Sequence, residues 1–100
     1  MTKRYLLVKI ISERPLSGEE FGQALTESVR RFFGEMGLFR IDPKLIRFDS
    51  QQSRAVIACK KEGAVELQTA LALISHASKM PIAPLTLRVS GTIKGLRRKK

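Results

Sequence analysis

The sequence is poor in the residues that build metal centres and nucleophilic active sites. Its 100 residues include one cysteine, one histidine and no asparagine. A lone Cys59 excludes an internal disulfide and a multi-cysteine metal site, and its strand-like surroundings predict a small core residue. His76 has no cysteine or histidine at ligand spacing, so we expect a solvated side chain. We therefore predict no metal site in the protein and identify no catalytic residue.

Long apolar runs are missing as well. No run approaches the roughly 20 residues that cross a bilayer. Residues 1–8 hold too short an apolar segment, and no small-residue cleavage site, for a secretory signal. We therefore expect a cytoplasmic protein that does not contact the membrane.

Acidic residues are scarce. The 9 Asp and Glu residues stand against 19 Lys and Arg, which gives a formal net charge of +10 and a pI near 10.5. This balance points to acidic partners, with nucleic acid first and an anionic membrane second. Glu19 and Glu20 look like paired catalytic carboxylates, but their place in the first turn of a helix explains them better.

Hydrophobic periodicity begins with a strand and a helix. Residues 5–11 form a nearly unbroken apolar run, which is typical of a central strand. Ser17 and Glu20 make a capping box that opens a helix, and Gly34 can supply its left-handed stop. The apolar residues of the following connection are expected to pack against the core; they are Met36, Leu38 and Phe39.

The second half of the chain repeats this pattern. Residues 45–48 and 53–60 are predicted strands joined as a hairpin. A second helix follows Gly63 and ends before Pro81, and its expected core face is Ala64, Leu67, Ala70, Leu71, Ile74 and Ala77. In the last strand we expect one half-buried face formed by Leu85, Leu87 and Val89.

The order strand, helix, strand, strand, helix, strand predicts an α+β fold. It is the split βαβ arrangement of ferredoxin-like and RRM-like sandwiches, with a four-stranded antiparallel sheet and two helices on one face. We expect a single domain over residues 1–92, followed by a basic carboxyl-terminal tail over residues 93–100.

In this topology the ends of the elements fall at two poles. One pole collects thirteen of the 19 basic residues, Arg40 and Lys44 among them, but only four acidic residues. The candidate RNA-binding residues at or near this pole are Lys3, Arg4, Arg30, Arg31, Lys60, Lys61, Arg88, Ser90, Gly91, Thr92, Lys94, Arg97, Arg98, Lys99 and Lys100. Such a cluster focuses an electric field on a polyanion.

The predicted third strand, residues 53–60, contains no aromatic residue. RNA-recognition domains of this topology stack bases on aromatics of that strand, so base stacking is not expected to carry affinity here. The remaining mode is contact with phosphates and riboses, which recognises shape rather than sequence. Neutralising about five phosphates would give a log–log salt slope of about −4.

The far side of the second helix is less polar than a solvated face. Its residues are Val65, Thr69, Ala72, Leu73 and His76. They predict a docking face for a partner protein, and the alternative is scattered surface apolar residues, which are common.

Several short motifs together resemble one family. They are Leu87-x-Val89-Ser90-Gly91-Thr92-Ile93-Lys94 at the last strand, Arg4-Tyr5-Leu6 at the first, Phe33-Gly34 in the first helix and Ile57-x-Cys59 in the third strand. Their order and spacing resemble archaeal ribonuclease P protein component 2, the Pop-five-like proteins. Ala58 departs from the basic residue that this family carries before the cysteine.

The resemblance implies an accessory subunit of the ribonucleoprotein endonuclease that removes the 5′ leader from precursor tRNA. In that family the RNA subunit performs the reaction with bound magnesium, so the protein itself needs no cofactor. The implied partners are ribonuclease P RNA, ribonuclease P protein component 3 and the other holoenzyme proteins. Paired heterodimers in the family imply a heterotetramer.

Two other functions remain open from the residues alone. One is a free-standing nucleic-acid-binding or ribosome-associated module. The other is a small-molecule-sensing ferredoxin-like domain, which would have a ligand pocket between paired domains and little salt dependence.

Overall fold

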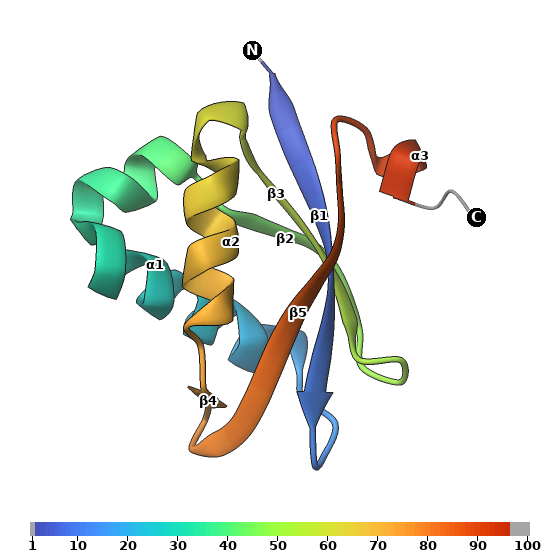
Figure 1. Cartoon of the computed structure of the whole chain (residues 1–100). Coiled ribbons are helices and arrows are strands. Elements are labelled where there is room, and N and C mark those ends of the chain that lie inside the picture. The colour runs from blue at the N-terminus through green and yellow to red at the C-terminus, as the bar shows by residue number, and fades with distance from the viewer. Residues whose placement is uncertain (1, 97–100) are drawn as a thin grey trace.

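The computed structural model describes residues 2–96 and has an antiparallel sheet with helices on both of its sides (Figure 1). The described residues form five strands and three α-helices, and the sheet order is β2-β3-β1-β5-β4. The predicted α+β fold is confirmed. The predicted count of four strands is wrong, because the short strand β4, His76–Ala77, pairs with the start of β5.

Strand β1, Lys3–Ser12, lies at the centre of the sheet between β3 and β5. Its residues Leu6, Val8 and Ile10 are fully buried beneath the helices. The prediction of a central strand from the apolar run is confirmed, since only a strand paired on both sides needs so little polar surface.

Helix α1, Gly18–Ile41, begins as predicted. The Glu20 backbone N–H donates to Ser17 Oγ at 3.1 Å, and the Ser17 backbone N–H donates to Glu20 Oε1 at 3.0 Å. The hydrogen bond from the Ser17 backbone N–H lowers the pKa of Glu20, and a hydrogen bond from the Ser78 side chain lowers it further. Gly34, with φ of 73° and ψ of −177°, interrupts the helix as predicted. The connection predicted after it is wrong, because the chain resumes a helical course and runs to Ile41.

The segment after the kink displays apolar residues that were expected in the core. Its inner face is taken by Gly37 and Ile41, which are buried, and by the partly buried Leu38. A helix presents only one stripe to the core, so the remaining residues point outward. Met36 is 77% exposed and Phe39 is 74% exposed, which contradicts their predicted packing.

The hairpin of β2, Lys44–Asp49, and β3, Arg54–Lys60, is confirmed. A 3₁₀ turn, η1, Lys61–Gly63, leads into α2, Ala64–Ala72, which ends earlier than predicted. Ile74 and Ala77 are still buried, but they lie beyond the helix. The physical reason is that β4 forms there and pairs with β5, which removes those residues from the helix.

Strand β5, Met80–Ser90, starts before Pro81 and carries a bulge opposite the Leu7–Val8 step of β1. Before the bulge Thr86 pairs with Val8, and after it Arg88 pairs with Leu7. Leu85, Leu87 and Val89 are 40–47% exposed, but the prediction that they share one face is wrong, because Leu85 pairs with Lys9 and Val89 with the buried Leu6. A bulge reverses which alternate residues face the core, so no single face can hold all three.

Helices α1 and α2 cover one face of the sheet, and the Ser28 hydroxyl joins them by donating to the Ala70 carbonyl at 2.7 Å. The short α3, Ile93–Leu96, lies on the other side (Figure 1), with Leu96 buried. We call this second side the outer face of the sheet. Among the helices of residues 2–96, none has the length and apolar character that a membrane crossing requires.

Candidate nucleic-acid interface

Four of the predicted RNA-binding residues meet where β1 begins and β3 ends. Lys3 pairs with Lys60 across the ladder, and Arg4 lies beside them opposite Cys59. Lys61 follows Lys60, and its backbone N–H donates to the Thr2 carbonyl at 3.1 Å. Like charges placed opposite each other on a sheet are unfavourable. A bound polyanion would remove that repulsion.

Lys60 is also held toward α1. Its ammonium group donates to the Phe39 carbonyl at 3.4 Å and lies 4.8 Å from the centre of the Phe39 ring. A cation over an aromatic face is an attractive arrangement. The exposed ring thus orients one of the cations at this end of the sheet.

The turn Ser90–Gly91–Thr92 adjoins the same end, because Ser90 pairs with Tyr5. The Ser90 hydroxyl accepts from the Thr92 backbone N–H at 3.2 Å, and the Thr92 hydroxyl accepts from the Gly95 N–H at 3.0 Å. A Cβ on Gly95 would lie 2.1 Å from Ser90 Oγ, so a larger residue there would displace the Ser90 hydroxyl. These hydroxyls shape the turn from β5 into α3.

The Arg4 guanidinium links the two groups. Its Nη1 donates to the Lys3 carbonyl at 3.1 Å and would lie 3.4 Å from a Cβ at Gly91. Lys94 is exposed on α3, directly after the turn. We call this set the basic end; it consists of Lys3, Arg4, Lys60, Lys61, Ser90, Gly91, Thr92 and Lys94. Four further predicted residues lie outside the described residues: Arg97, Arg98, Lys99 and Lys100.

Arg30 and Arg31 do not belong to the basic end. Because α1 continues past Gly34, they lie within the helix and not at its end. Arg30 Nε is 2.7 Å from a Glu35 carboxylate oxygen. Both arginines line a hollow with Leu73, at the carboxyl end of α2, whereas Lys60 and Lys61 lie at its amino end.

Two other basic residues of the predicted pole are paired with acids. Arg40 holds Glu66 through two hydrogen bonds of 3.2 and 2.5 Å, and Lys44 lies 3.9 Å from Asp42. Their charge is partly neutralised, so the basic end has fewer free cations than the sequence predicts.

Arg88 lies next to the basic end, on the same face of β5 as Ser90 and two residues before it. It pairs with Leu7 and lines a groove of about 520 Å³ on the outer face. Two arginines that sequence analysis did not select, Arg47 and Arg54, line the same groove. The sequence could have indicated this position, because Arg47 and Arg54 are next to Phe48 and Ala55, apolar residues that face the helices. Neighbouring residues of a strand point to opposite faces of the sheet.

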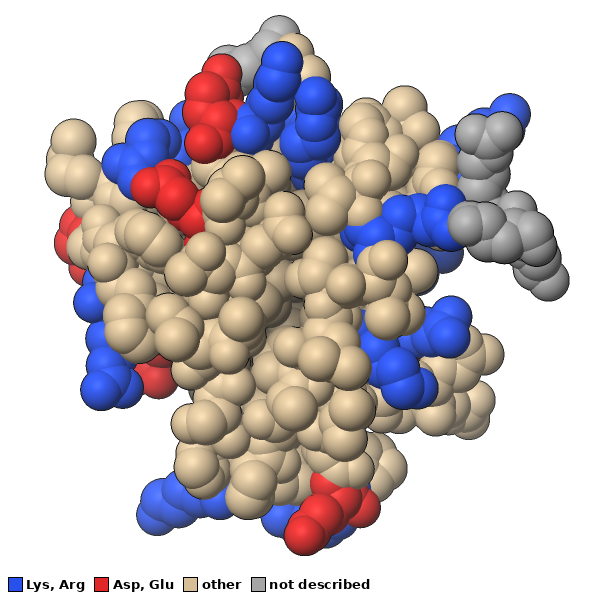
Figure 2. Space-filling view, viewed as in Figure 1, with Lys and Arg blue, Asp and Glu red and all other residues tan. Residues whose placement is uncertain are grey.

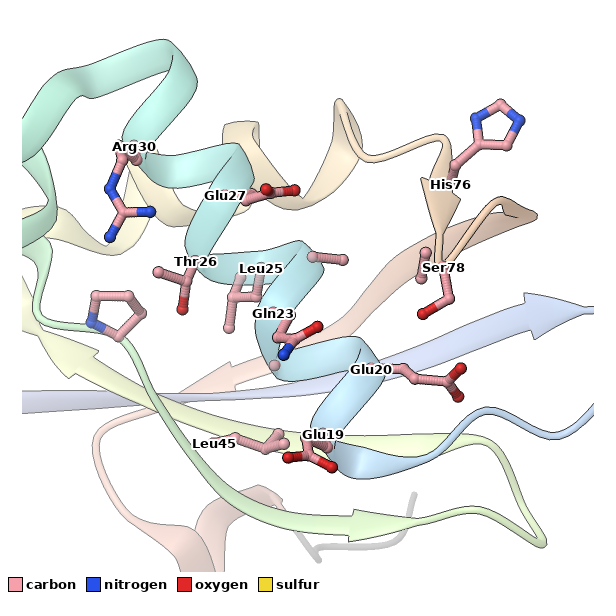
Figure 3. Close-up of a pocket in the computed structure, with 14 residues that line it drawn as sticks. Glu19, Glu20, Gln23, Leu25, Thr26, Glu27, Arg30, Leu45, His76 and Ser78 are labelled. Atoms are coloured by element: carbon pink, nitrogen blue, oxygen red, sulfur yellow. The ribbon is translucent and has the colours of Figure 1, made fainter.

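A hollow of about 850 Å³ beside α1 has the wrong charge for a polyanion (Figure 3). It is lined by Glu19, Glu20 and Glu27, against the single basic residue Arg30. Figure 3 shows these side chains projecting along α1. We therefore do not assign nucleic-acid binding to it.

Residues 2–96 contain no group of three or more His, Cys, Asp or Glu side chains that could hold a metal ion. Cys59 is buried, as the sequence predicts, and desolvation raises the pKa of its thiol to about 11. A thiol with this pKa is inert at neutral pH, because the thiolate is the reactive form.

A family model described as the Rpp14/Pop5 family matches residues 4–100, nearly the whole chain. The chain belongs to the Rpp14/Pop5 family. The match includes all of the basic end except Lys3.

Curated relatives agree with this assignment. The chain is 34% identical to a ribonuclease P protein component 2 from Pyrococcus furiosus, over 97% of this chain and 81% of the relative. It is 36% identical to the protein of the same name from Archaeoglobus fulgidus, over 97% of this chain and 86% of that one. A Thermococcus kodakarensis protein of this name is 32% identical, over 96% and 80%.

A chain in the cryo-EM structure of yeast ribonuclease MRP has the same fold. The TM-score is 0.77, the sequence identity is 15%, and the match covers 99% of this chain and 79% of the yeast chain. The fold of this Rpp14/Pop5 protein is thus shared with a chain of very different sequence.

The predicted partner face of this Rpp14/Pop5 protein is exposed along α2 and just beyond it. Val65 is 75% exposed and Leu73 is 48% exposed, and Thr69, Ala72 and His76 are also exposed. His76 lies in β4 and not on the helix as expected. Figure 2 shows that the surface over α2 is mainly uncharged, with basic and acidic atoms near its margins.

Proposed function

We propose that this protein is a non-catalytic subunit of ribonuclease P that binds and braces the RNA which cleaves the 5′ leader from precursor tRNA. The observation that carries the proposal is membership of the Rpp14/Pop5 family over nearly the whole chain, with relatives named ribonuclease P protein component 2. The basic end supports it, because cations clustered at one end of a small domain suit a phosphate backbone.

In this proposal the protein supplies position and charge, and the RNA supplies the reaction. Magnesium ions would be bound by the RNA. The basic end would contact phosphates and riboses through Lys3, Arg4, Lys60, Lys61 and Lys94. The holoenzyme would act in the cytoplasm.

The uncharged face of α2 would receive a second protein subunit, for which ribonuclease P protein component 3 is our candidate, within a heterotetramer. Leu73 and Val65 support this assignment, because apolar side chains on an uncharged surface favour protein contacts.

We also propose that the ferredoxin-like part of the fold consists of the four longer strands with α1 and α2, within residues 1–92. Residues 93–100 would then form a basic extension, which begins with α3.

Ultraviolet crosslinking of the tagged protein in its native cells, followed by sequencing of the attached RNA, tests the proposal. We expect strong enrichment of ribonuclease P RNA. Crosslinks scattered over many RNAs would instead support a general nucleic-acid-binding module. The absence of crosslinked RNA would refute both functions.

Reconstitution gives an independent check. Precursor tRNA cleavage is measured with the RNA and the other protein subunits, with and without this protein. We expect this protein to increase the cleavage rate or to lower the magnesium requirement.

A further inference from the structure

A cross-strand row on the outer face has a cation at each end and aliphatic side chains between them. The register pairs Arg47 of β2 with Val56 of β3, Val56 with Leu7 of β1, and Leu7 with Arg88 of β5. Residues paired in this way project from the same side of a sheet. With strands about 4.8 Å apart, the Cα atoms of Arg47 and Arg88 are separated by about 14 Å.

The neighbouring row adds one more cation to the groove. Asp49 pairs with Arg54, and both line the groove. The Asp49 carboxylate is already engaged, since its Oδ1 accepts the backbone N–H groups of Gln51 and Gln52 at 3.0 and 3.2 Å. The groove therefore has three arginines and one aspartate, a local excess of positive charge.

Apolar side chains line the groove between its charged residues. Leu87 at the bulge lines it, together with Ile93 and Leu96 of α3. Its volume of about 520 Å³ falls in the range of small-molecule sites, about 300–1,000 Å³. A groove of this size is too small for an RNA duplex but has room for one extruded nucleotide.

We propose that this groove binds a single unpaired nucleotide of RNA. One face of the base would lie on the side chains of Leu7 and Val56. The phosphates on either side of the nucleotide would lie toward Arg47 and Arg88. Charge complementarity supports this occupant, and an arginine guanidinium can also stack on a base where no aromatic ring is present. The inference rests on the proposed RNA-binding function and adds to it a site for unpaired RNA, which adjoins the basic end on the same face of the sheet.

The test compares two RNA hairpins that differ by one bulged nucleotide. Three double variants are measured beside the wild type by fluorescence anisotropy. Arg47→Gln with Arg88→Gln removes the groove cations, and Lys3→Gln with Lys61→Gln removes cations of the basic end. Arg14→Gln with Lys79→Gln is the charge-matched control at exposed sites.

We expect the wild type and the control to bind the bulged hairpin about tenfold more tightly than the paired one, since one charge-assisted contact is worth about this factor. The groove variant should lose this preference. The basic-end variant should bind both hairpins more weakly and keep the preference. Wild-type protein without a preference, or a groove variant that retains it, would overturn the groove proposal.

The two proposals fail in different ways. If the basic-end variant loses affinity while no bulge preference is seen, the RNA-binding function stands and the groove proposal is wrong. If the wild type binds neither hairpin, the RNA-binding function itself is contradicted.

Two further measurements exclude trivial explanations. Leu87→Glu places an acid in the groove at a half-exposed site without emptying the core, and it should also abolish the preference. Methyl NMR of Leu7, Val56 and Ile93 should report the bulged hairpin. If adenosine monophosphate alone shifts these methyl signals with equal affinity, the groove is a site for free nucleotides and the RNA assignment is wrong.

Discussion

The salt dependence of RNA binding gives a quantitative test of the basic end. Five cations lie there in the described part of the chain: Lys3, Arg4, Lys60, Lys61 and Lys94. Each phosphate contact contributes about −0.9 to the slope of log affinity against log salt on a duplex. If all five engage phosphates, the slope is about −4.5, and affinity falls about 500-fold between about 50 and 200 mM salt.

Replacing Lys3 and Lys61 with glutamine removes two of these contacts. Both side chains are exposed, so the fold should be unaffected. The slope should become shallower by about 1.8, and the loss over the same salt range should fall to about 40-fold. The difference between the two slopes does not depend on how many other cations bind, so residues 97–100 do not complicate it.

The assay is fluorescence anisotropy with ribonuclease P RNA over a salt series. The double variant Arg14→Gln, Lys79→Gln has the same net charge and serves as the control. If both variants show the same slope, bulk charge explains binding and the basic end has no special role. If the Lys3, Lys61 variant keeps the wild-type slope, the two lysines do not contact phosphates and the reasoning is refuted.

Three other predictions concern packing, partner binding and thiol reactivity. Gly63→Ala should lower the melting temperature by at least about 4 °C, because its Cβ would lie 2.7 Å from the backbone at the end of α1. The control Gly22→Ala, whose Cβ would have no atom closer than 3.9 Å, should be neutral or stabilising. Equal melting temperatures of the two variants would contradict this packing. Leu73→Asp should abolish co-purification with the partner protein, whereas Ile46→Asp, at a site of nearly equal exposure on β2, should not. If both variants still co-purify with the partner, the α2 face is not the docking surface. A maleimide should label Cys59 slowly in the native protein at mildly alkaline pH and rapidly after unfolding, since burial raises the thiol pKa to about 11; rapid native labelling would show that the thiol is accessible.

Features encoded by local chemistry could be predicted from the sequence. The start of α1 follows from two side-chain hydrogen bonds between Ser17 and Glu20, which depend only on residues three apart. The central position of β1 follows from the density of its apolar residues, and the burial of Cys59 follows from its strand neighbours. In each case the pattern that indicates the structure lies within a few neighbouring residues.

The end of α1 could not be predicted in this way. Gly34 does adopt the left-handed φ that ends many helices. Whether the chain then leaves the helix depends on Ile41, which packs against Gly63 from a distant part of the sequence. This tertiary contact favours a kinked helix, and it decides that Met36 and Phe39 face outward.

The same limit applies to the candidate site. Lys3 and Lys60 could be brought together once the order of strands was known, because their register follows from the topology. Arg30 and Arg31 are absent from the basic end because α1 is longer than the sequence predicts and continues to Ile41. The position of each cation was predicted from the end of its helix or strand. An error in that end therefore moves the cation as well.

The groove depends on one extra residue in β5. If the alternation that buries Met80 and Ile82 continued unbroken, Arg88 would face the helices, where an unpaired charge is costly. The bulge at Leu87 turns Arg88 outward to pair with Leu7. The alternation of Leu85, Leu87 and Val89 in the sequence predicts a regular strand, so the bulge, and the groove that depends on it, could be found only from the pairing of β5 with β1.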